Sequence, residues 1–207
     1  MVFTAPCEEE GPRGGTILRL ERSLGPAQLE RRNRLLVAAG GLASEGGYRA
    51  VTMRDVADRA GLGLATVYRY FASKDHLIAE VHTAAGLVIA SELAEHPVGG
   101  ANGQEGVVRF FELLVESVTR DLNLASAGVM AWSSGDPAAT SSEQWHTQAI
   151  GPCINAAYGT EDVGDREEIG EILGHLAFSV IVSLTNGSLD SESAVKLLTA
   201  TVRRTLP

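Results

Sequence analysis

The chain has 207 residues, of which 44% are apolar and 21% are charged, and this balance excludes a disordered acidic chain. Apolar runs are short and interrupted by charge or glycine, so we expect neither a membrane span nor a membrane partner. The N-terminus places three glutamates where a signal peptide needs positive charge, which predicts a cytoplasmic protein. The two cysteines, Cys7 and Cys153, are too few for a disulfide framework or a Cys-rich zinc site.

The net charge of −9 is unevenly distributed along the chain. Residues 11–76 hold eleven Lys/Arg against six Asp/Glu, whereas residues 77–207 hold six against seventeen. A basic N-terminal segment is therefore joined to an acidic body. This asymmetry favours an anionic partner for the first part, although a solvated basic face would give the same count.

The pattern of apolar residues predicts an all-α protein. Residues 1–25 are rich in glycine and proline without a sustained apolar period, which indicates a mobile leader. Beyond it Ala, Leu, Glu and Arg dominate and strand-like alternation is scarce. We expect about nine helices, at residues 26–46, 53–60, 65–71, 74–95, 104–123, 124–134, 140–158, 165–186 and 191–206.

Residues that start or stop helices set these boundaries. Gly46-Gly47 should end the first helix, and Thr52 with Asp55 forms a capping box for the second. The other expected signals are a stop at Gly61, a cap at Ser73, a cap within Thr140 to Glu143, a cap at Asp165, a stop at Gly187 and a cap at Ser191.

Residues 53–72, MRDVADRAGLGLATVYRYFA, fit a helix-turn-helix, in which two short helices cross steeply around a tight turn. The crossing needs a small residue where the backbones approach, here Ala57, and a turn residue that tolerates left-handed dihedral angles, here Gly61. The second helix would then present Leu64, Ala65, Thr66, Tyr68 and Arg69 to a major groove. A corner of two helices packed inside a bundle has the same spacing, so the spacing leaves both readings open.

The run from Arg34 to Leu77 carries a more specific pattern. It contains Gly47-Tyr48, then TMRDVA at 52–57, AGL at 60–62, TVYRYF at 66–71 and SKDHL at 73–77. This run resembles the N-terminal DNA-binding domain of the TetR family of transcriptional regulators. The stretch TVYRYFASKDHL is similar to the branch of that family that controls lipid and steroid breakdown in actinobacteria. The sequence departs from many members at Gly63-Leu64-Ala65, where they have Ser or Lys.

The resemblance implies which residues would meet double-stranded DNA. Thr52, Tyr68 and Lys74 suit phosphate oxygens, and Arg69 suits a guanine or a phosphate. The full set of expected DNA contacts is Thr52, Arg54, Gly63, Leu64, Ala65, Thr66, Tyr68, Arg69 and Lys74. The three arginines Arg31, Arg32 and Arg34 could add phosphate contacts, with a solvated helix face as the alternative for each. Tyr70 and Phe71 are assigned to the core.

The resemblance also implies that the C-terminal helices form a ligand pocket and a homodimer interface. Residues 165–186 are apolar over most of the helix circumference, which requires cover on two sides, and the last helix could add to that surface. The expected dimer interface is Ile169, Leu173, Leu176, Val180, Leu184, Val195, Leu198 and Val202, with burial inside one subunit as the alternative. Candidates for lining a pocket for a small hydrophobic effector are Phe110, Phe111, Leu114, Met130, Trp132, Trp145, His146 and Phe178, each of which could instead be plain core.

No catalytic residue, metal site or cofactor is expected. The chain lacks G-x-S-x-G, P-loop and H-E-x-x-H motifs, and its five histidines have no paired ligand spacing. The resemblance implies a helix-turn-helix DNA-binding domain at 26–73 and a helical ligand-binding and dimerisation domain at 74–207. The predicted function is a ligand-responsive transcriptional repressor that binds a pseudo-palindromic operator. The alternative is a helical module that has kept this fold without binding DNA.

Overall fold

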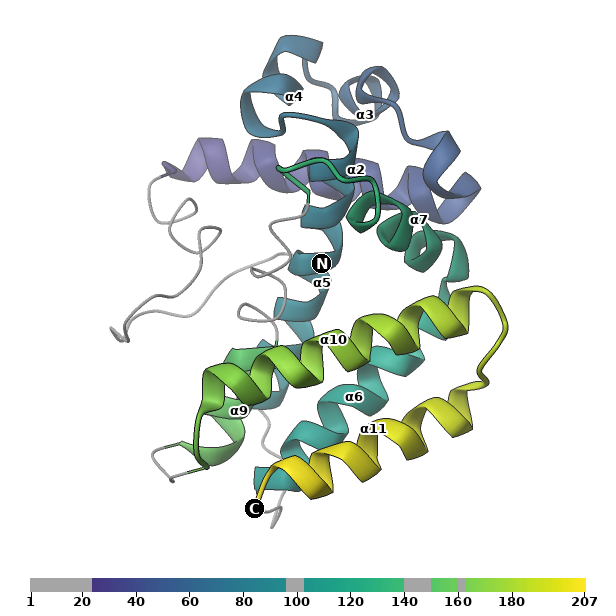
Figure 1. Cartoon of the computed structure of the whole chain (residues 1–207). Helices are drawn as coiled ribbons and strands as arrows, with labels where there is room; N and C mark the ends of the chain where they lie inside the picture. The colour runs from purple at the N-terminus through teal and green to yellow at the C-terminus, as the bar shows by residue number, and fades with distance from the viewer. Residues whose placement is uncertain (1–23, 96–102, 140–149, 160–162) are drawn as a thin grey trace.

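The computed structural model describes residues 24–95, 103–139, 150–159 and 163–207, and within these ranges it is built of helices without strands (Figure 1). This agrees with the all-α prediction. The described helices are α2 (Pro26–Ala50), α3 (Met53–Ala60), α4 (Leu64–Tyr70), α5 (Lys74–Glu95), α6 (Gly103–Arg120), α7 (Leu122–Trp132), α9 (Gly151–Tyr158), α10 (Arg166–Thr185) and α11 (Ser191–Thr205).

The helices pack around two hydrophobic cores. In the N-terminal half, α3 and α4 lie at one end of the molecule above α2, while α6, α9, α10 and α11 gather at the other end (Figure 1). The long helix α5 runs between the two ends. Both cores include α5 and α7: Leu77 and Ala127 pack in the N-terminal core, whereas Ala90 and Ala125 pack in the C-terminal one. The two halves are thus joined by packed helices.

Most helix ends follow the local signals in the sequence. Thr52 caps α3 by accepting a hydrogen bond from the Asp55 backbone N–H at 3.1 Å, and Gly61 ends the helix in the left-handed conformation with φ 62°. The Ser73 hydroxyl accepts from the His76 N–H at 2.9 Å, and Asp165 accepts from two N–H groups of α10. Such caps are predictable because they depend only on residues adjacent in sequence.

The first helix bends where Gly46-Gly47 was predicted to end it. Gly46 and Gly47 leave helical geometry, and Gly47 adopts φ 66° with ψ −163°. A side chain is strained in that region of backbone space, which explains the glycine. One further helical turn follows and brings Tyr48 toward the start of α5.

Two predicted boundaries were wrong. The helix expected at 104–123 ends at Arg120, because Asp121 caps a new helix by accepting from the Leu124 N–H at 2.9 Å. Leu122, expected within the helix at 104–123, instead begins α7. The last helix is capped by Asp190 instead of Ser191, through a hydrogen bond from the Ser193 N–H at 2.8 Å. The start of the helix predicted at 140–158 lies outside the described residues.

Helix α10 is long and apolar enough, by length and composition, to cross a membrane, which the sequence analysis did not anticipate. It packs against α6, α9 and α11 and buries Leu173, Ala177 and Val180 in the C-terminal core. On the flank of this buried face Ile172 is exposed and Leu176 packs at the edge of the core, so the apolar surface extends beyond the residues that the core covers. This distribution is typical of a helix covered on two sides.

Candidate DNA-binding site

The crossing of α3 and α4 is fixed by small and branched apolar side chains. Val56 and Val67 are fully buried between the helices, and Ala57 is almost fully buried beside them. Leu62, in the turn, donates its N–H to the Ala57 carbonyl at 2.9 Å, which is a common way to close a helix C-terminus after a left-handed glycine. The pair is therefore a rigid unit whose outer face is set by α4.

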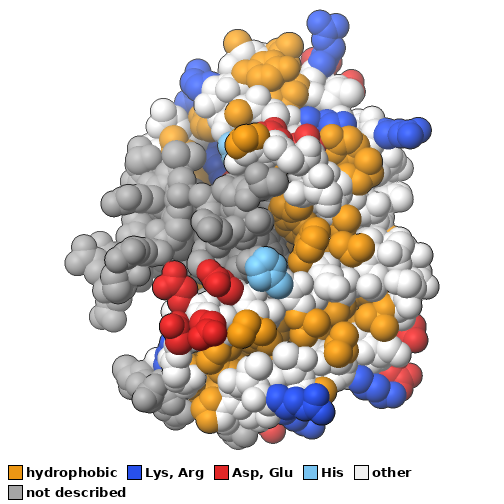
Figure 2. All heavy atoms as spheres, viewed as in Figure 1, with side chains coloured by type: hydrophobic (Ala, Val, Ile, Leu, Met, Phe, Trp, Pro, Cys, Tyr) orange, Lys and Arg blue, Asp and Glu red, His pale blue; other side chains and the backbone are white. Residues whose placement is uncertain are grey.

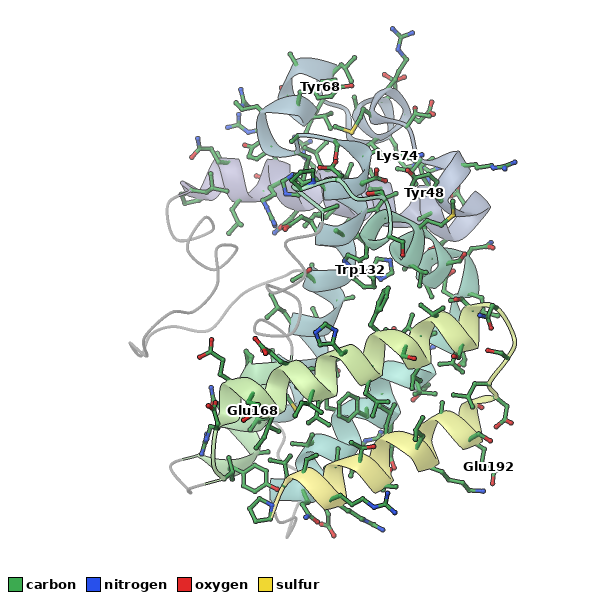
Figure 3. All side chains as sticks on the ribbon, viewed as in Figure 1. Tyr48, Tyr68, Lys74, Trp132, Glu168 and Glu192 are labelled. Atoms are coloured by element: carbon green, nitrogen blue, oxygen red, sulfur yellow. The ribbon has the colours of Figure 1, made fainter. Side chains whose placement is uncertain are left out.

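Helix α4 exposes most of the residues expected to meet a major groove. Leu64, Ala65, Tyr68 and Arg69 are exposed, and Thr66 is partly buried. Tyr68 is 55% exposed and extends from the free side of α4 at the end of the molecule (Figure 3). An exposed tyrosine on a short, well-anchored helix is suited to reaching a large, flat or charged partner.

Arg69 is oriented by its neighbour in sequence. Its guanidinium carbon lies 5.3 Å from the centre of the Tyr70 ring, within the range of a cation–π contact. Tyr70 is itself half-buried and Phe71 is 1% exposed, in agreement with their assignment to the core. The Arg69 side chain is thus exposed, and its contact with the Tyr70 ring holds it in place.

Two residues expected to bind phosphate are engaged within the protein. The Thr52 hydroxyl donates to the Asp55 carboxylate at 2.5 Å, so its proton is directed away from solvent. The Lys74 ammonium lies 3.5 Å from the centre of the Tyr48 ring and donates to the Tyr48 carbonyl at 3.1 Å. Burial lowers the pKa of Lys74. Both residues therefore shape the domain in this structure, while Arg54 is exposed.

Tyr48 fastens the end of α2 to the start of α5. Its hydroxyl donates to the Asp75 carboxylate at 2.6 Å, which raises the pKa of Tyr48 to about 12. With Lys74 on its ring, Tyr48 is held from two sides (Figure 3). Sequence reasoning placed Tyr48 in a motif but missed this contact, because the kink at Gly47 that creates it is a feature of the folded backbone.

The arginines of α2 and α3 are less free to contact DNA phosphates than the sequence indicates, because several of them bind other groups of the protein. Arg32 is buried in an ion pair with Glu80 of α5, so the prediction of a phosphate contact or a solvated face was wrong for this residue. Arg59 forms two hydrogen bonds of 2.8 and 2.7 Å with the Glu45 carboxylate. Arg31 donates to the Ala27 carbonyl at 2.8 Å, and Arg34 is exposed.

The effector candidates differ in how deeply they are buried. Phe110, Phe111 and Leu114 are buried in the C-terminal core, and Met130 is exposed. Trp145 and His146 lie outside the described residues. Trp132 and Phe178 are partly buried and meet edge to face at 5.8 Å between α7 and α10 (Figure 3). His82, which the sequence did not single out, lies 5.1 Å from the Trp132 ring. An open groove of about 790 Å³ lies elsewhere, along α2 and the end of α3.

The residues predicted for the dimer interface lie mostly inside the subunit. Leu173, Val180, Leu184, Leu198 and Val202 are buried in the C-terminal core, while Ile169, Leu176 and Val195 are partly buried. The outer faces of α10 and α11 instead expose Ile172 and Leu197. Figure 2 shows a band of hydrophobic side chains along this side of the molecule.

These features define a helix-turn-helix protein whose recognition helix, α4, is joined to a second helical core. Comparison with known proteins gives the same assignment. Residues 35–81 match the family model described as bacterial regulatory proteins, tetR family.

Two full-length relatives extend the match beyond that domain. The HTH-type transcriptional repressor KstR of Rhodococcus jostii RHA1 is 31% identical over 177 residues, which cover 83% of this chain and 81% of that protein. KstR of Mycobacterium tuberculosis H37Rv is 30% identical over 185 residues, which cover 88% and 84%. The chain belongs to the TetR family of bacterial regulatory proteins, which confirms the resemblance noted in the sequence.

Solved structures agree on the fold. A TetR transcriptional regulator from Rhodococcus sp. RHA1 superposes with a TM-score of 0.74 at 26% identity and covers 87% of this chain and 97% of its own. FadR of Thermus thermophilus, solved with lauroyl-CoA, gives 0.68 at 16% identity over 85% and 95%.

Proposed function

We propose that this protein is a transcriptional repressor that binds a pseudo-palindromic operator as a homodimer and releases it when a small hydrophobic effector binds. The observation that carries the proposal is the outer face of α4, where Tyr68 and Arg69 are exposed on a helix anchored by Val67. The relatives KstR bear the description of transcriptional repressors, which supports repression over activation. Such a regulator works in the cytoplasm, where its operator lies.

DNA recognition follows from the chemistry of this face. Arg69 can form two hydrogen bonds with one guanine, while the small residues Gly63 and Ala65 let the backbone approach a base edge or a thymine methyl. Tyr68 and Arg54 suit phosphate oxygens. With few polar groups at residues 63–65, much of the affinity would come from phosphate contacts and would depend steeply on salt.

The homodimer would form through α10 and α11, whose outer faces expose Ile172 and Leu197. A two-fold axis there would hold the two α4 helices roughly 34–36 Å apart, one turn of DNA, on an operator with two-fold symmetry. Effector binding near Trp132 and Phe178 would move α5, which begins at Lys74, and would change that spacing. A ligand that releases DNA should therefore change the distance between spin labels on the two α4 helices.

The decisive experiment selects duplexes from a random DNA library with the purified protein and titrates the enriched duplex at several salt concentrations. We expect a palindromic motif and a logarithmic salt slope that reports several phosphate contacts. If no duplex is enriched, the proposal fails and the alternative of a helical module that does not read DNA is favoured.

Substitution of Arg69 tests how much this one residue of the α4 outer face contributes to operator binding. Arg69→Ala should weaken operator binding by about 1–3 kcal/mol without lowering the melting temperature, because its side chain is exposed. Arg120→Ala removes one exposed arginine from α6 in the other half and should leave affinity within about two-fold. Equal losses in both variants would contradict a role for Arg69 in recognition.

A further inference from the structure

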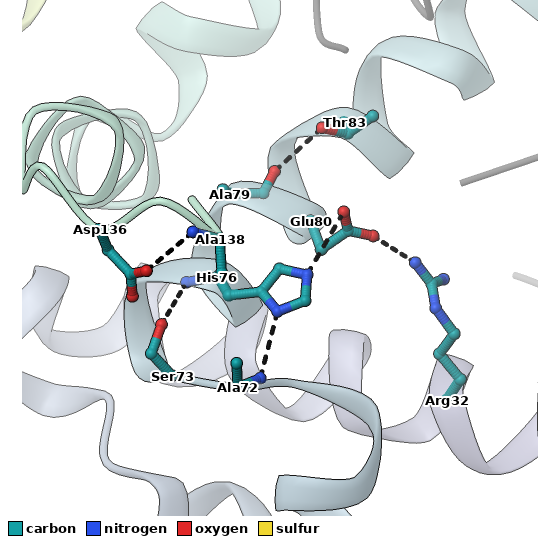
Figure 4. A network of polar contacts seen from close by, with 9 residues as sticks. All are labelled: Arg32, Ala72, Ser73, His76, Ala79, Glu80, Thr83, Asp136 and Ala138. Carbon is teal, nitrogen blue, oxygen red and sulfur yellow. Dashed lines mark hydrogen bonds and ion pairs between the residues drawn. The ribbon is translucent and has the colours of Figure 1, made fainter. Parts of the chain in front are cut away.

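Only residues 71–73 connect the recognition helix α4 to helix α5. The last of them, Ser73, caps α5 by accepting a hydrogen bond from the His76 N–H at 2.9 Å. The middle one, Ala72, donates its N–H to Nδ1 of the His76 ring at 3.2 Å (Figure 4). This pair of bonds resembles a capping box, in which the side chain of the third helical residue reaches back to the chain before the helix. His76 thus holds the connection with both its backbone and its ring.

The ring of His76 is itself fixed by side chains of two helices. Its Nε2 lies 3.9 Å from the Glu80 carboxylate, and Glu80 forms a buried ion pair with Arg32 of α2 (Figure 4). The ring also meets the Phe71 ring edge to face, with 5.6 Å between the ring centres. Phe71 is 1% exposed, and the Arg32 guanidinium carbon lies 5.7 Å from the centre of its ring. Helices α2 and α5 therefore hold the ring in the position from which it binds Ala72.

The contact with Ala72 specifies the protonation state of His76. A backbone N–H can only donate, so Nδ1 carries no proton, and the proton of the neutral ring lies on Nε2, which faces Glu80. A protonated ring carries a hydrogen on both nitrogens and cannot accept from Ala72. The bond to the connection therefore requires the neutral ring.

The surroundings of His76 favour this neutral form. Among the described residues, charged groups face the ring from α5, through Glu80, from α2, through Arg32, and from the loop after α7, through Asp136. Burial and the Arg32 guanidinium lower the pKa of His76, while the Asp136 carboxylate raises it. The net result is a pKa below the ordinary value of 6.5, so the ring is neutral at pH 7.5 and gains its proton only in acid.

We propose that neutral His76 is a positioning residue for DNA recognition, which fixes the orientation of α4 by accepting a hydrogen bond from Ala72. His76 touches no DNA in this scheme. Helix α4 has only seven residues, of which Val67 alone is buried, so its orientation depends on how its ends are held. The inference rests on the proposed function, because the orientation of α4 matters only if α4 binds the operator.

Two substitutions separate the acceptor from the ring. His76→Asn places an amide oxygen near the position of Nδ1 and keeps an acceptor that does not titrate, whereas His76→Phe keeps a ring and removes the acceptor. At pH 7.5 we expect His76→Asn to bind the selected duplex within about two-fold of the wild type, and His76→Phe to bind it roughly three- to ten-fold more weakly. His175→Asn, at an exposed histidine of α10, is the control and should keep the wild-type affinity.

The pH dependence of binding distinguishes this role from a purely structural one. Below pH 6.5 the wild type should lose affinity relative to His76→Asn, by roughly three- to ten-fold once the ring is protonated, because that ring cannot accept from Ala72. Deuterium exchange of the Ala72 amide, followed by NMR, should be equally slow in both proteins at pH 7.5. At pH 5 it should be faster in the wild type than in His76→Asn.

The outcomes separate the two proposals. Equal pH dependence of the wild type and His76→Asn overturns the positioning role and leaves the repressor intact, as does wild-type affinity in His76→Phe or equally weak binding by both variants. If His76→Phe unfolds, the comparison of the wild type with His76→Asn decides alone. Failure of the wild type to select any duplex overturns the repressor, and exchange of the Ala72 amide then decides whether His76 holds the connection.

Discussion

His82 is held neutral at the contact between α5 and α7. Its Nε2–H donates to the Leu124 carbonyl at 3.0 Å, and burial lowers the pKa of His82 to about 4. In the unfolded chain this histidine titrates near its ordinary value of 6.5. Between these two pKa values the unfolded state binds more protons than the folded state, so the free energy of unfolding must fall as the pH is lowered.

This difference predicts a pH dependence that belongs to one side chain. Between pH 7.5 and pH 5, His82 should lower the free energy of unfolding by about 2 kcal/mol. Urea denaturation of His82→Gln should show a smaller decrease over that range than the wild type. The exposed His175, changed to Gln, should keep the wild-type decrease. An identical pH dependence for all three proteins would contradict a neutral, partly buried His82.

Single residues also show what a sequence can reveal about this site. Tyr68 and Arg69 were predicted to be exposed because their spacing relative to buried Val67 places them on the outer side of a short helix. Lys74 and Arg32 have the same charge and lie in the same basic segment, yet Tyr48 and Glu80 engage them. Those partners come from other helices, and no local pattern identifies them.

Helix α7 packs closely against α2 and α5 through small residues. Ala127 and Ala131 are fully buried in the N-terminal core, where their small side chains allow α7 to lie close to α2. Gly128 faces α5, and a Cβ atom there would lie 2.4 Å from Nε2 of His82. The position of α7 therefore depends on these small residues.

Gly128→Ala should therefore destabilise the protein by about 1–3 kcal/mol, because α7 or the enclosed His82 ring must shift. Gly170→Ala is the matched control: Gly170 is also buried, but apart from the adjacent backbone of α10 no atom of the described residues lies within 4 Å of the added methyl group. That variant should unfold at the same or a higher urea concentration, since alanine favours the helix. Equal stability of Gly128→Ala and the wild type would show that α7 is packed more loosely than described.

The helices differ in how well the sequence predicts their ends. Thr52, Ser73 and Asp165 cap helices as predicted, since each precedes a clear helical pattern. The break at Asp121 was missed because apolar residues continue at helical spacing on both sides of it. Whether a residue inside such a pattern caps a new helix depends on where that helix packs. The spacing of apolar residues alone does not give this information.

The outer side of α10 and α11 governs how whole subunits would associate. Ile172 and Leu197 are 46% and 45% exposed there, within the hydrophobic band of Figure 2. We expect the double variant Ile172→Glu/Leu197→Glu to halve the mass measured by sedimentation equilibrium, because burying two carboxylates at a dimer interface is costly. Operator affinity should fall with it.

Leu122→Glu provides the control for this prediction. Leu122 is 47% exposed, but it lies at the start of α7, where the neighbouring Asn123 side chain donates to the Ser44 carbonyl of α2. The control should have the same mass as the wild type. A wild-type protein that is monomeric at the concentrations used for DNA binding, or a double variant that stays dimeric, would contradict the proposed interface.

For the chain as a whole, composition and charge predicted a basic N-terminal segment with an anionic partner and an acidic body. Because α10 is apolar around most of its circumference, we predicted that it would be covered on two sides. The periodicity of its apolar residues could not show which of them face the core of the subunit. Leu173 and Val180 were consequently expected at a partner subunit and are found in the subunit core. That choice is made by the packing of α10 against α6 and α11, which the period of α10 alone does not reveal.

The N-terminal core is completed by residues that follow the recognition helix, some by a few residues and others by a long stretch of chain. Leu77 and Ile78 of α5 and Ala127 and Ala131 of α7 pack with the helix-turn-helix in one cluster. A DNA-binding domain truncated after residue 73 would lose all four of these core residues and expose the apolar surface that they cover. Exchange of DNA specificity between such regulators would therefore require transplanting the α7 face together with residues 26–78, or redesigning that face in the recipient.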